Sequence, residues 1–166
     1  MSFPPFSVVP LSNQHVKAGF SSGSDILDRY FRERAGQDIK RNLAKCFVAV
    51  DNEHQRIAGF YTLSAAQIPL TKLPRPLAEK MPRYEAIPAS RMGRLAIDSN
   101  YQGLGLGSAL IADALRRSAG SPMAVYALLV DAKDDKAAAF YLNHGFIPCD
   151  GAPSTLFLPL DTLQKL

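Results

Sequence analysis

The fold class is decided by residues 94–115, which read RLAIDSNYQGLGLGSALIADAL. Apolar residues before the glycines predict a strand over Met92–Asp98. After the glycines, apolar residues recur at helical spacing and predict a helix over Leu106–Ser118. A strand that leads through a glycine loop directly into a helix is typical of domains in which helices pack on a sheet.

The loop contains three glycines, Gly103, Gly105 and Gly107. Glycine allows positive φ angles and lets the backbone approach a ligand closely. The first turn of a helix exposes N–H groups without intrahelical partners and the positive end of the helix dipole. The loop and the helix start therefore predict a cradle for a pyrophosphate.

The loop has three other interpretations. The phosphate loop of nucleotide hydrolases ends in Gly-Lys-Ser/Thr, and we reject it because Ser108 follows Gly107 with no lysine between them. A dinucleotide fingerprint reads G-x-G-x-x-G, and here the third glycine comes one position early, although Asp131 ends a later strand as a ribose-binding acid would. A glycine-rich turn without a ligand is the third alternative.

Outward from this stretch, the patterns predict further strands and helices. Apolar residues spaced four apart between positions 27 and 43 predict an amphipathic helix, or two short ones broken near Gly36. A fully apolar run predicts a buried strand over Met123–Val130, and a helix over Lys133–His144 is ended by Gly145. The other expected elements are strands at Phe6–Val9, Phe146–Pro148 and Thr155–Leu158, a hairpin of Cys46–Val50 with Ile57–Leu63, and an irregular connection over 69–88 with a short helix near Leu77–Met81. This order indicates an α/β (mixed α+β) chain with a mixed sheet and helices on both faces.

Length and composition limit the class of protein. The 166 residues and the ordinary balance of apolar and charged side chains predict a single domain over residues 1–166. Cys46 and Cys149 form no disulfide framework and no segment resembles a secretory signal, so we expect a reducing cytosol and buried thiols. The longest apolar run is too short to cross a bilayer, so no membrane partner is expected.

The net charge is +4, and the basic excess lies in residues 1–100. Two basic stretches contain Arg29, Arg32, Arg34, Lys40, Arg41 and Lys45, and Lys72, Arg75, Lys80, Arg83, Arg91 and Arg94. Such an excess can attract a polyanion to one face. Solvated helix faces and ordinary surface loops are the simpler interpretation.

Two motifs resemble the signatures of the GNAT acetyltransferases. Residues 102–107, QGLGLG, are similar to Q/R-x-x-G-x-G/A, and residues 134–146 are similar to N-x-x-A-x-x-[LF]-Y-x-x-x-G-F. The resemblance covers residues 91–148 and implies a central mixed, mostly antiparallel twisted sheet with acetyl-CoA as cofactor and CoA as product. It implies cofactor contacts at Leu95, Ala96, Ile97, Gln102, Gly103, Leu104, Gly105, Leu106, Gly107, Ser108, Asp134 and Phe140. Asp134 departs from the common Asn, so its contact differs from the family pattern.

A closer resemblance covers most of the chain. Residues 25–31, 47–50, 58–63 and 94–98 look like the GNAT toxins of bacterial toxin–antitoxin modules, which acetylate aminoacyl-tRNA. The resemblance implies aminoacyl-tRNA as substrate, a ribbon-helix-helix antitoxin as partner and a place in the bacterial cytoplasm. GNAT dimers are common, which makes a homodimer possible. Members usually carry His where this sequence has Asp131.

The implied reaction is attack of an amine on a thioester, with protonation of the departing thiolate. Tyr141 is the candidate acid, because a phenol with a pKa near roughly 10 is protonated at neutral pH and because it matches the tyrosine of the family. A core aromatic beside Phe140 is the other interpretation, and the two roles are compatible. A backbone N–H around Ala96 or Ile97 would polarise the carbonyl.

No base is evident in the sequence. Glu85 and Asp98 are acids in plausible places, but surface or capping roles are more usual for such residues. An α-amine has a pKa of about 8 and needs no dedicated base, whereas a lysine amine at about 10.4 does, so this favours an α-amine substrate. His15 and His54 lie in expected loops and His144 near a helix end, and no Cys/His spacing predicts a metal site.

Charge and resemblance together predict a tRNA-facing patch of Arg29, Arg32, Arg41, Arg83 and Arg91. Two alternatives stay open. The first is a GNAT enzyme acting on a small amine, a peptide or a protein. The second is a non-catalytic GNAT-fold binding protein, against which the intact cofactor signatures argue.

Overall fold

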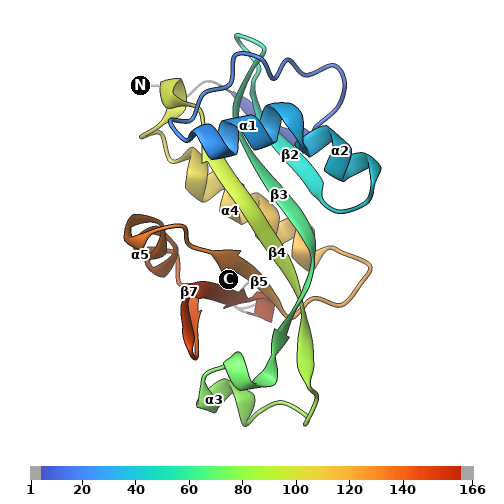
Figure 1. The fold of residues 1–166 in the computed structure, drawn as a ribbon, viewed down its shortest axis with the longest axis vertical. Helices are drawn as coiled ribbons and strands as arrows, with labels where there is room; N and C mark the ends of the chain where they lie inside the picture. The colour runs from blue at the N-terminus through green and yellow to red at the C-terminus, as the bar shows by residue number, and fades with distance from the viewer. Residues whose placement is uncertain (1–4, 162–166) are drawn as a thin grey trace. The chain divides into compact units, whose positions relative to one another are not determined.

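The computed structural model describes residues 5–161 as strands, α-helices and two short 3₁₀ helices (Figure 1). In chain order these are β1 (Phe6–Pro10), α1 (Asp25–Glu33), α2 (Ala35–Lys40), β2 (Lys45–Asp51), β3 (Arg56–Pro69), η1 (Leu70–Lys72), α3 (Arg75–Ala78), β4 (Ala86–Ile97), η2 (Ser99–Tyr101), α4 (Leu106–Ala119), β5 (Ala127–Asp131), α5 (Asp135–Asn143), β6 (Ile147–Cys149) and β7 (Ala152–Pro159). Among the helices of these described residues, none is long and apolar enough to cross a membrane.

The strands form one seven-stranded sheet in the order β1-β2-β3-β4-β5-β7-β6. β4 and β5 run parallel, with Ala89 beside Ala127 and Met92 beside Val130. The pairs β1–β2, β2–β3, β5–β7 and β6–β7 are antiparallel. The expected mixed, mostly antiparallel sheet is therefore confirmed.

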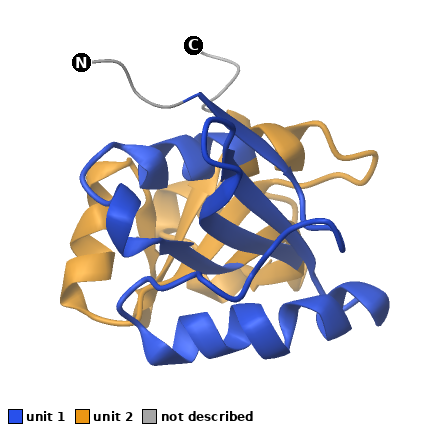
Figure 2. Ribbon diagram, turned by 90° about the horizontal axis from the view of Figure 1, so that it is seen from above, with its two compact units in different colours: residues 1–64, 93–113 blue, residues 65–92, 114–166 orange. Residues whose placement is uncertain are grey.

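The chain divides into two compact units, coloured separately in Figure 2. Unit 1 contains residues 1–64 and 93–113, and unit 2 contains residues 65–92 and 114–166. The long strands β3 and β4 each continue from one unit into the other.

The core of unit 1 lies between α1 and the strands beneath it (Figure 1). Phe31 stacks on Phe60 with ring centroids 4.4 Å apart, and Phe20 meets both rings edge-on or tilted. Ser24 begins α1 as its N-cap, because its side chain accepts the N–H of Leu27. Burial of these aromatic rings fixes α1 on its strands.

Helices cover both faces of the sheet in unit 1. The side chain of Phe60 points to the α1 face. A Cβ added to the neighbouring Gly59 would meet Ile97 Cδ1 at 3.0 Å and Leu110 Cδ1, on α4, at 3.2 Å. Because consecutive strand residues point to opposite faces, α4 lies on the face opposite to α1. Glycine at position 59 is what lets α4 approach this closely.

The core of unit 2 forms from the neighbouring strands β4, β5 and β7 with the segment around α3. Its buried members are Ile68, Leu73, Ile87, Ala89, Ala127, Leu129, Cys149 and Phe157. Both cysteines of the chain are buried and free, and burial raises the pKa of the Cys46 thiol to about 12. The expectation of buried, unpaired thiols is confirmed.

Several expected boundaries were wrong, and β3 ends at Pro69 rather than Leu63. β4 begins at Ala86 rather than Met92, and β5 begins at Ala127 rather than Met123, which is 68% exposed. The short helix forms at Arg75–Ala78 rather than near Leu77–Met81. Prolines explain this shift, because Pro76 fits the first turn of a helix, whereas a proline at position 82 disfavours helix in the residue before it.

Candidate active site

The glycine loop of unit 1 has the backbone that a cradle requires. Gly103 and Gly105 have φ angles of +81° and +79°, a region that side chains disfavour. A Cβ added to either glycine would meet nothing within 4 Å, so both face open space. The carbonyl of Gly105 accepts the N–H of Ala109 at 3.2 Å, and α4 therefore starts directly after the loop.

The start of α4 provides the donors for an anion. Leu106 is buried and anchors the helix in the core, so only its backbone can face a ligand. The N–H groups of Leu106 and Gly107 belong to the first turn and have no intrahelical acceptor. Open space over two exposed glycines beside these donors fits a pyrophosphate, as the sequence predicted.

Gln102 holds the loop in place. Its Nε2 donates to the carbonyl of Ile97 at 3.1 Å and to the carbonyl of Ser22 at 3.0 Å. The side chain thus joins the end of β4, the glycine loop and the segment that precedes α1. The signature glutamine positions the loop by bonds to backbone that lies up to 80 residues away.

Asp98, one of the two acids considered as a base, has a structural role. Its buried carboxylate accepts the N–H of Asn100 at 2.9 Å and the N–H of Ser21 at 3.0 Å, and it caps η2. Glu85 is exposed, in the connection before β4. The capping interpretation of Asp98 is therefore confirmed.

A buried hydrogen bond supports the segment in front of the glycine loop. The Tyr101 hydroxyl donates to Oδ2 of Asp51, which is 1% exposed, at 2.6 Å. Oδ1 of Asp51 accepts the N–H of Glu53, and His54 Nδ1 lies 2.9 Å from Oδ2. The bond from Tyr101, and then those from His54 and Glu53, lower the pKa of Asp51. Nothing in the sequence pattern pointed to this pair.

Replacing Tyr101 with Phe should destabilise the protein by about 1.5–3 kcal/mol at neutral pH, the usual value for a hydrogen bond to a charged group. The native pKa of Asp51 is depressed, so its contribution is present above the unfolded pKa of about 3.9 and is lost as pH falls through the native value. Urea unfolding of both proteins between pH 7 and pH 3 measures this. The difference should shrink below about pH 4.

The matched control for this prediction is Tyr84→Phe, which removes a hydroxyl from an exposed tyrosine. It should change the free energy of unfolding by less than about 0.5 kcal/mol at every pH. Equal effects of the two substitutions, or a Tyr101→Phe effect that does not change with pH, would contradict the proposed coupling to Asp51.

Tyr141 lies in α5, in unit 2, and both expected roles fit its surroundings. Its ring packs against Phe140 and Phe146 with centroids 5.5 and 5.4 Å away, and the residue is 7% exposed. Its hydroxyl bonds to no described residue, and no buried side-chain N or O atom among the described residues lacks a partner. The hydroxyl therefore reaches the surface while the ring is part of the core, which leaves it available to a substrate.

Electrostatics keep Tyr141 protonated. Burial, and then the negative charge of Asp131, raise the pKa of Tyr141 to about 12. Asp131 ends β5 and is held by two partners, because Arg91 forms an ion pair with it and the hydroxyl of Thr155 donates to its Oδ1 at 3.0 Å. The Tyr141 hydroxyl therefore keeps its proton and can donate a hydrogen bond across the physiological pH range.

The second signature forms the start and the end of α5. Asp134, where Asn is common in the family, is the N-cap, and its Oδ1 accepts the N–H of Ala137 at 2.8 Å. Carboxylate and amide oxygens both accept this bond, so the departure leaves the cap intact. At the other end, Nδ1 of His144 donates to the carbonyl of Phe140 at 2.7 Å, as expected for a histidine at a helix C-terminus.

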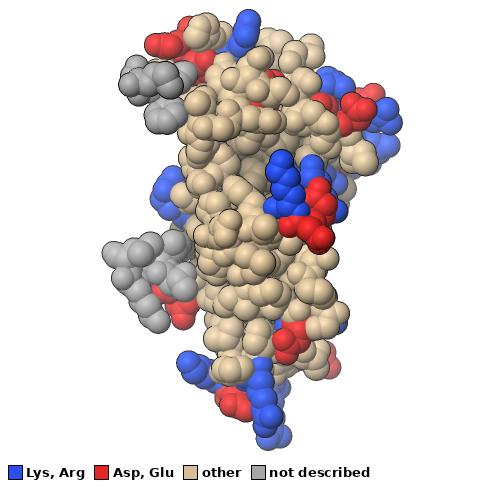
Figure 3. Space-filling model, turned by 90° about the vertical axis from the view of Figure 1, so that its left-hand side faces the viewer, with Lys and Arg blue, Asp and Glu red and all other residues tan. Residues whose placement is uncertain are grey.

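The basic side chains predicted to face tRNA occupy different surroundings. Arg41 and Arg83 are exposed, and Arg29 lies 3.9 Å from Glu33 in an exposed pair. Arg32 donates to the carbonyl of Phe20 at 3.1 Å, and so holds the segment before α1, while Arg91 pairs with an acid. On the face drawn in Figure 3, basic side chains occur in small groups with acidic ones among them. Their contact with RNA stays a prediction.

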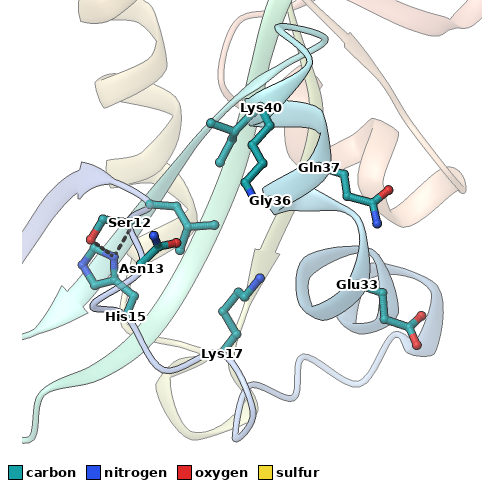
Figure 4. A pocket seen from close by; sticks show the side chains of 10 residues that line it. Ser12, Asn13, His15, Lys17, Glu33, Gly36, Gln37 and Lys40 are labelled. Atoms are coloured by element: carbon teal, nitrogen blue, oxygen red, sulfur yellow. Dashed lines mark hydrogen bonds between the residues drawn. The ribbon is translucent and has the colours of Figure 1, made fainter.

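Unit 1 also contains an open depression of about 630 Å³ between the segment after β1 and the α1–α2 corner (Figure 4). Lys17, Lys40 and Gln37 line it with polar groups, and Leu11 and Ile39 give it an apolar base. Nδ1 of His15 accepts the N–H of Ser12 at 2.9 Å, so the His15 ring is bonded within its own loop. None of these residues belongs to the predicted cofactor set.

One group among the described residues brings three possible metal ligands within 4.8 Å of one another, Asp51, Glu53 and His54. The buried carboxylate of Asp51 is already engaged by Tyr101 and by the turn that follows β2. We assign this group to the turn and propose no metal there.

Comparison with known proteins decides the family. Residues 42–148 match the family model of the acetyltransferase (GNAT) domain, which is more than half of the chain. The chain belongs to the GNAT acetyltransferases. The match includes the glycine loop and ends after Tyr141, so the two motifs that predicted the family lie inside it.

Relatives cover this GNAT chain almost completely. A tRNA-acetylating toxin of Mycobacterium tuberculosis is 36% identical over 158 residues, which are 94% of this chain and 93% of that protein. The probable toxin TacT of Sinorhizobium fredii is 28% identical over 163 residues, which are 93% and 90% of the two chains. Among solved structures, AtaT complexed with acetyl-methionyl-tRNAfMet superimposes with a TM-score of 0.89 at 27% identity, covering 97% of this chain and 98% of AtaT. The expected GNAT fold is thus confirmed.

Proposed function

We propose that this acetyltransferase moves the acetyl group of acetyl-CoA to the α-amine of aminoacyl-tRNA and acts as a translation-blocking toxin. The observation that carries the proposal is the 36% identity, over 94% of this chain, to a tRNA-acetylating toxin. The similarity to AtaT in complex with acetyl-methionyl-tRNA supports the same acceptor. Residues 1–166 would act as one catalytic domain.

The glycine loop is proposed to bind the pyrophosphate of acetyl-CoA. The N–H groups of Leu106 and Gly107 donate to it, and the exposed glycines give its oxygens space. Leu95, Ala96 and Ile97 in β4 would offer backbone groups to the pantetheine arm. Bound acetyl-CoA supplies an activated acetyl thioester, and the protein supplies its orientation toward the amine.

Tyr141 is proposed to be the acid. As the amine nitrogen bonds to the acetyl carbon and the C–S bond breaks, the Tyr141 hydroxyl donates its proton to the sulfur. The proton lost by the amine passes to solvent. A dedicated base is not required for an α-amine with a pKa of about 8, which agrees with the structural engagement of Asp98.

Partners follow from the same family. Structures of AtaT bound to the C-terminus of the antitoxin AtaR, and of the KacTA–DNA complex, support a cognate antitoxin for this chain. We propose an antitoxin of the ribbon-helix-helix type, a homodimeric toxin and a place in the bacterial cytoplasm. The alternative acceptor is a small amine, a peptide or a protein.

Transfer of labelled acetyl groups tests the proposal. Purified protein and labelled acetyl-CoA are mixed with charged tRNA in one tube and with tRNA stripped of amino acids in another. Label should appear only in the charged tRNA. Label transferred instead to free amines or protein termini, with none in charged tRNA, would establish the alternative acceptor class.

A further inference from the structure

A guanidinium in unit 1 is held in a fixed position without using its hydrogen-bond donors. Cζ of Arg94 lies 3.6 Å above the ring centroid of Tyr30, a cation–π stack. No described residue accepts a hydrogen bond from this guanidinium, and Arg94 is half-buried. Because a stacked guanidinium presents its N–H groups at its edge, the donors of Arg94 remain open to a ligand.

The tyrosine under this guanidinium is itself fixed. Tyr30 is 8% exposed in α1, and its hydroxyl donates to Oδ2 of Asp38, in α2, at 2.7 Å. Its ring also lies nearly parallel to that of Phe60, with centroids 6.5 Å apart. α1, α2 and β3 thus fix the plane on which Arg94 rests, and little side-chain entropy remains to be lost when a ligand binds.

Arg94 lies on the face of β4 opposite to the glycine-loop helix. The buried Ala96, two residues further along the strand, packs in the α1 core, whereas the side chain of Ile97 lies beside Leu110 of α4. Arg94 shares the face of Ala96 because strand side chains alternate. One strand therefore presents backbone next to the proposed cofactor site and an open guanidinium on its other face.

Four other arginines in the described residues are engaged by acids or by backbone. Arg29 pairs with Glu33, Arg75 with Glu79 and Arg91 with Asp131, and Arg32 holds the carbonyl of Phe20. Arg94 differs from these four because, within the described residues, it stacks on an aromatic ring and forms no ion pair, which leaves its charge uncompensated by a carboxylate. A fixed, uncompensated guanidinium favours a phosphate, which it can bind with two parallel hydrogen bonds.

We propose that Arg94 is a positioning residue that binds a backbone phosphate of the nucleic-acid acyl acceptor, close to the end that carries the amine. This inference rests on the proposed function and adds a residue to it. The phosphate contact fixes where the acceptor strand lies against the α1 face, and so directs the amine toward the thioester. Arg94 was absent from the residues predicted to face tRNA.

The test compares Arg94→Gln with the wild-type protein in acetylation of charged tRNA. The KM for charged tRNA should rise at least tenfold, while the Kd for acetyl-CoA and the initial rate on a free amino acid ester stay within twofold. The slope of log(kcat/KM) against log[salt] should become shallower by about 0.7–0.9, the value for one lost phosphate contact. A purely structural role would not change this slope.

Three further variants separate the stack from the charge. Arg94→Lys keeps a charge but lacks the planar fork, so its KM should lie between those of the wild type and Arg94→Gln. Tyr30→Leu removes the stacking surface and should also raise the KM, whereas Tyr30→Phe keeps the ring and should change the KM less.

Arg75→Gln is the matched control, because it removes an exposed arginine that is paired with Glu79. It should leave the KM for charged tRNA and the salt slope unchanged.

The outcomes distinguish this inference from the proposed function. Charged tRNA acetylated by the wild type, with an unchanged KM and salt slope in a folded Arg94→Gln protein, would overturn the role of Arg94 alone. No acetylation of charged tRNA by the wild type would overturn both. If Arg94→Gln loses its thermal transition, the KM and the salt slope of Arg94→Lys decide the question, and wild-type values there contradict the inference.

Discussion

Tyr141→Phe should lower kcat for charged tRNA by about 10²–10³-fold, within the range for loss of a general acid. The Kd for acetyl-CoA should stay within twofold, because the phenyl ring keeps its packing between Phe140 and Phe146. Steady-state kinetics with labelled acetyl-CoA, and calorimetric titration of the cofactor, measure the two quantities separately. A loss in kcat without a loss in binding assigns the role to the hydroxyl.

Tyr84→Phe is the control for this substitution, because it removes the hydroxyl of an exposed tyrosine. It should leave kcat unchanged. Equal rates for Tyr141→Phe and the wild type would reduce Tyr141 to a packing residue.

The pH profile of the wild type gives a second readout of Tyr141. Activity should rise as the substrate α-amine loses its proton near or below pH 8, and then stay level to about pH 10. Because the pKa of Tyr141 is about 12, its ionisation does not lower the rate in that range. An ordinary tyrosine with a pKa near 10 would produce a decline there. The assay needs an amide-linked analogue of aminoacyl-tRNA, since the ester hydrolyses in base.

Gly105→Leu should abolish measurable acetyl-CoA binding in a protein that still folds. The added side chain would enter the open space over the loop, where the pyrophosphate is proposed to lie. The positive φ of 79° adds strain of about 1–2 kcal/mol, which a marginally stable domain can tolerate. Calorimetric titration measures the affinity, and circular dichroism confirms the fold.

Gly151→Leu separates the effect of backbone strain from the effect of filling the space where the pyrophosphate is proposed to lie. Gly151 lies in the turn between β6 and β7 with a φ of +73°, so leucine there meets similar strain outside the glycine loop. This variant should lose stability but keep its affinity for acetyl-CoA. Unchanged affinity in Gly105→Leu, or equal loss in both variants, would remove the cradle assignment.

The sequence predicted the order of most elements because their patterns are local. The four-residue spacing between positions 27 and 43 predicted α1 and α2, and Gly145 predicted the end of α5, whereas its N-cap Asp134 was not predicted. The first half of β4 was missed because Pro88 interrupts it. In the structure the side chain of Pro88 is exposed, and proline has no N–H that would need a partner. The carbonyl of Pro88 still accepts the N–H of Tyr126 at 2.9 Å, so the strand continues through it.

The site was predictable where a single backbone segment forms it and hidden where distant residues meet. The glycine loop has a local signature, so its cradle geometry was expected. Two contacts join residues that are far apart in the sequence: Tyr101 bonds to Asp51, 50 positions away, and Arg94 stacks on Tyr30, 64 positions away. A single sequence does not show which distant residues meet. The bond of Gln102 to Ser22 was hidden for the same reason, because it joins residues 80 positions apart.

The hydrogen bonds that join the end of β4 and the glycine loop to the segment before α1 also affect how the protein folds. Ser21 and Ser22 meet Asp98 and Gln102 only after the chain between them has closed a long loop. The entropic cost of closure grows only slowly with loop length, but such distant contacts form late and slow the folding of the whole molecule. During synthesis, the strands β2 and β3 can pair as soon as they leave the ribosome. The loop lacks these hydrogen bonds until residue 102 has emerged, so a nascent chain can form α1, α2 and the β2–β3 hairpin before the glycine loop is fixed.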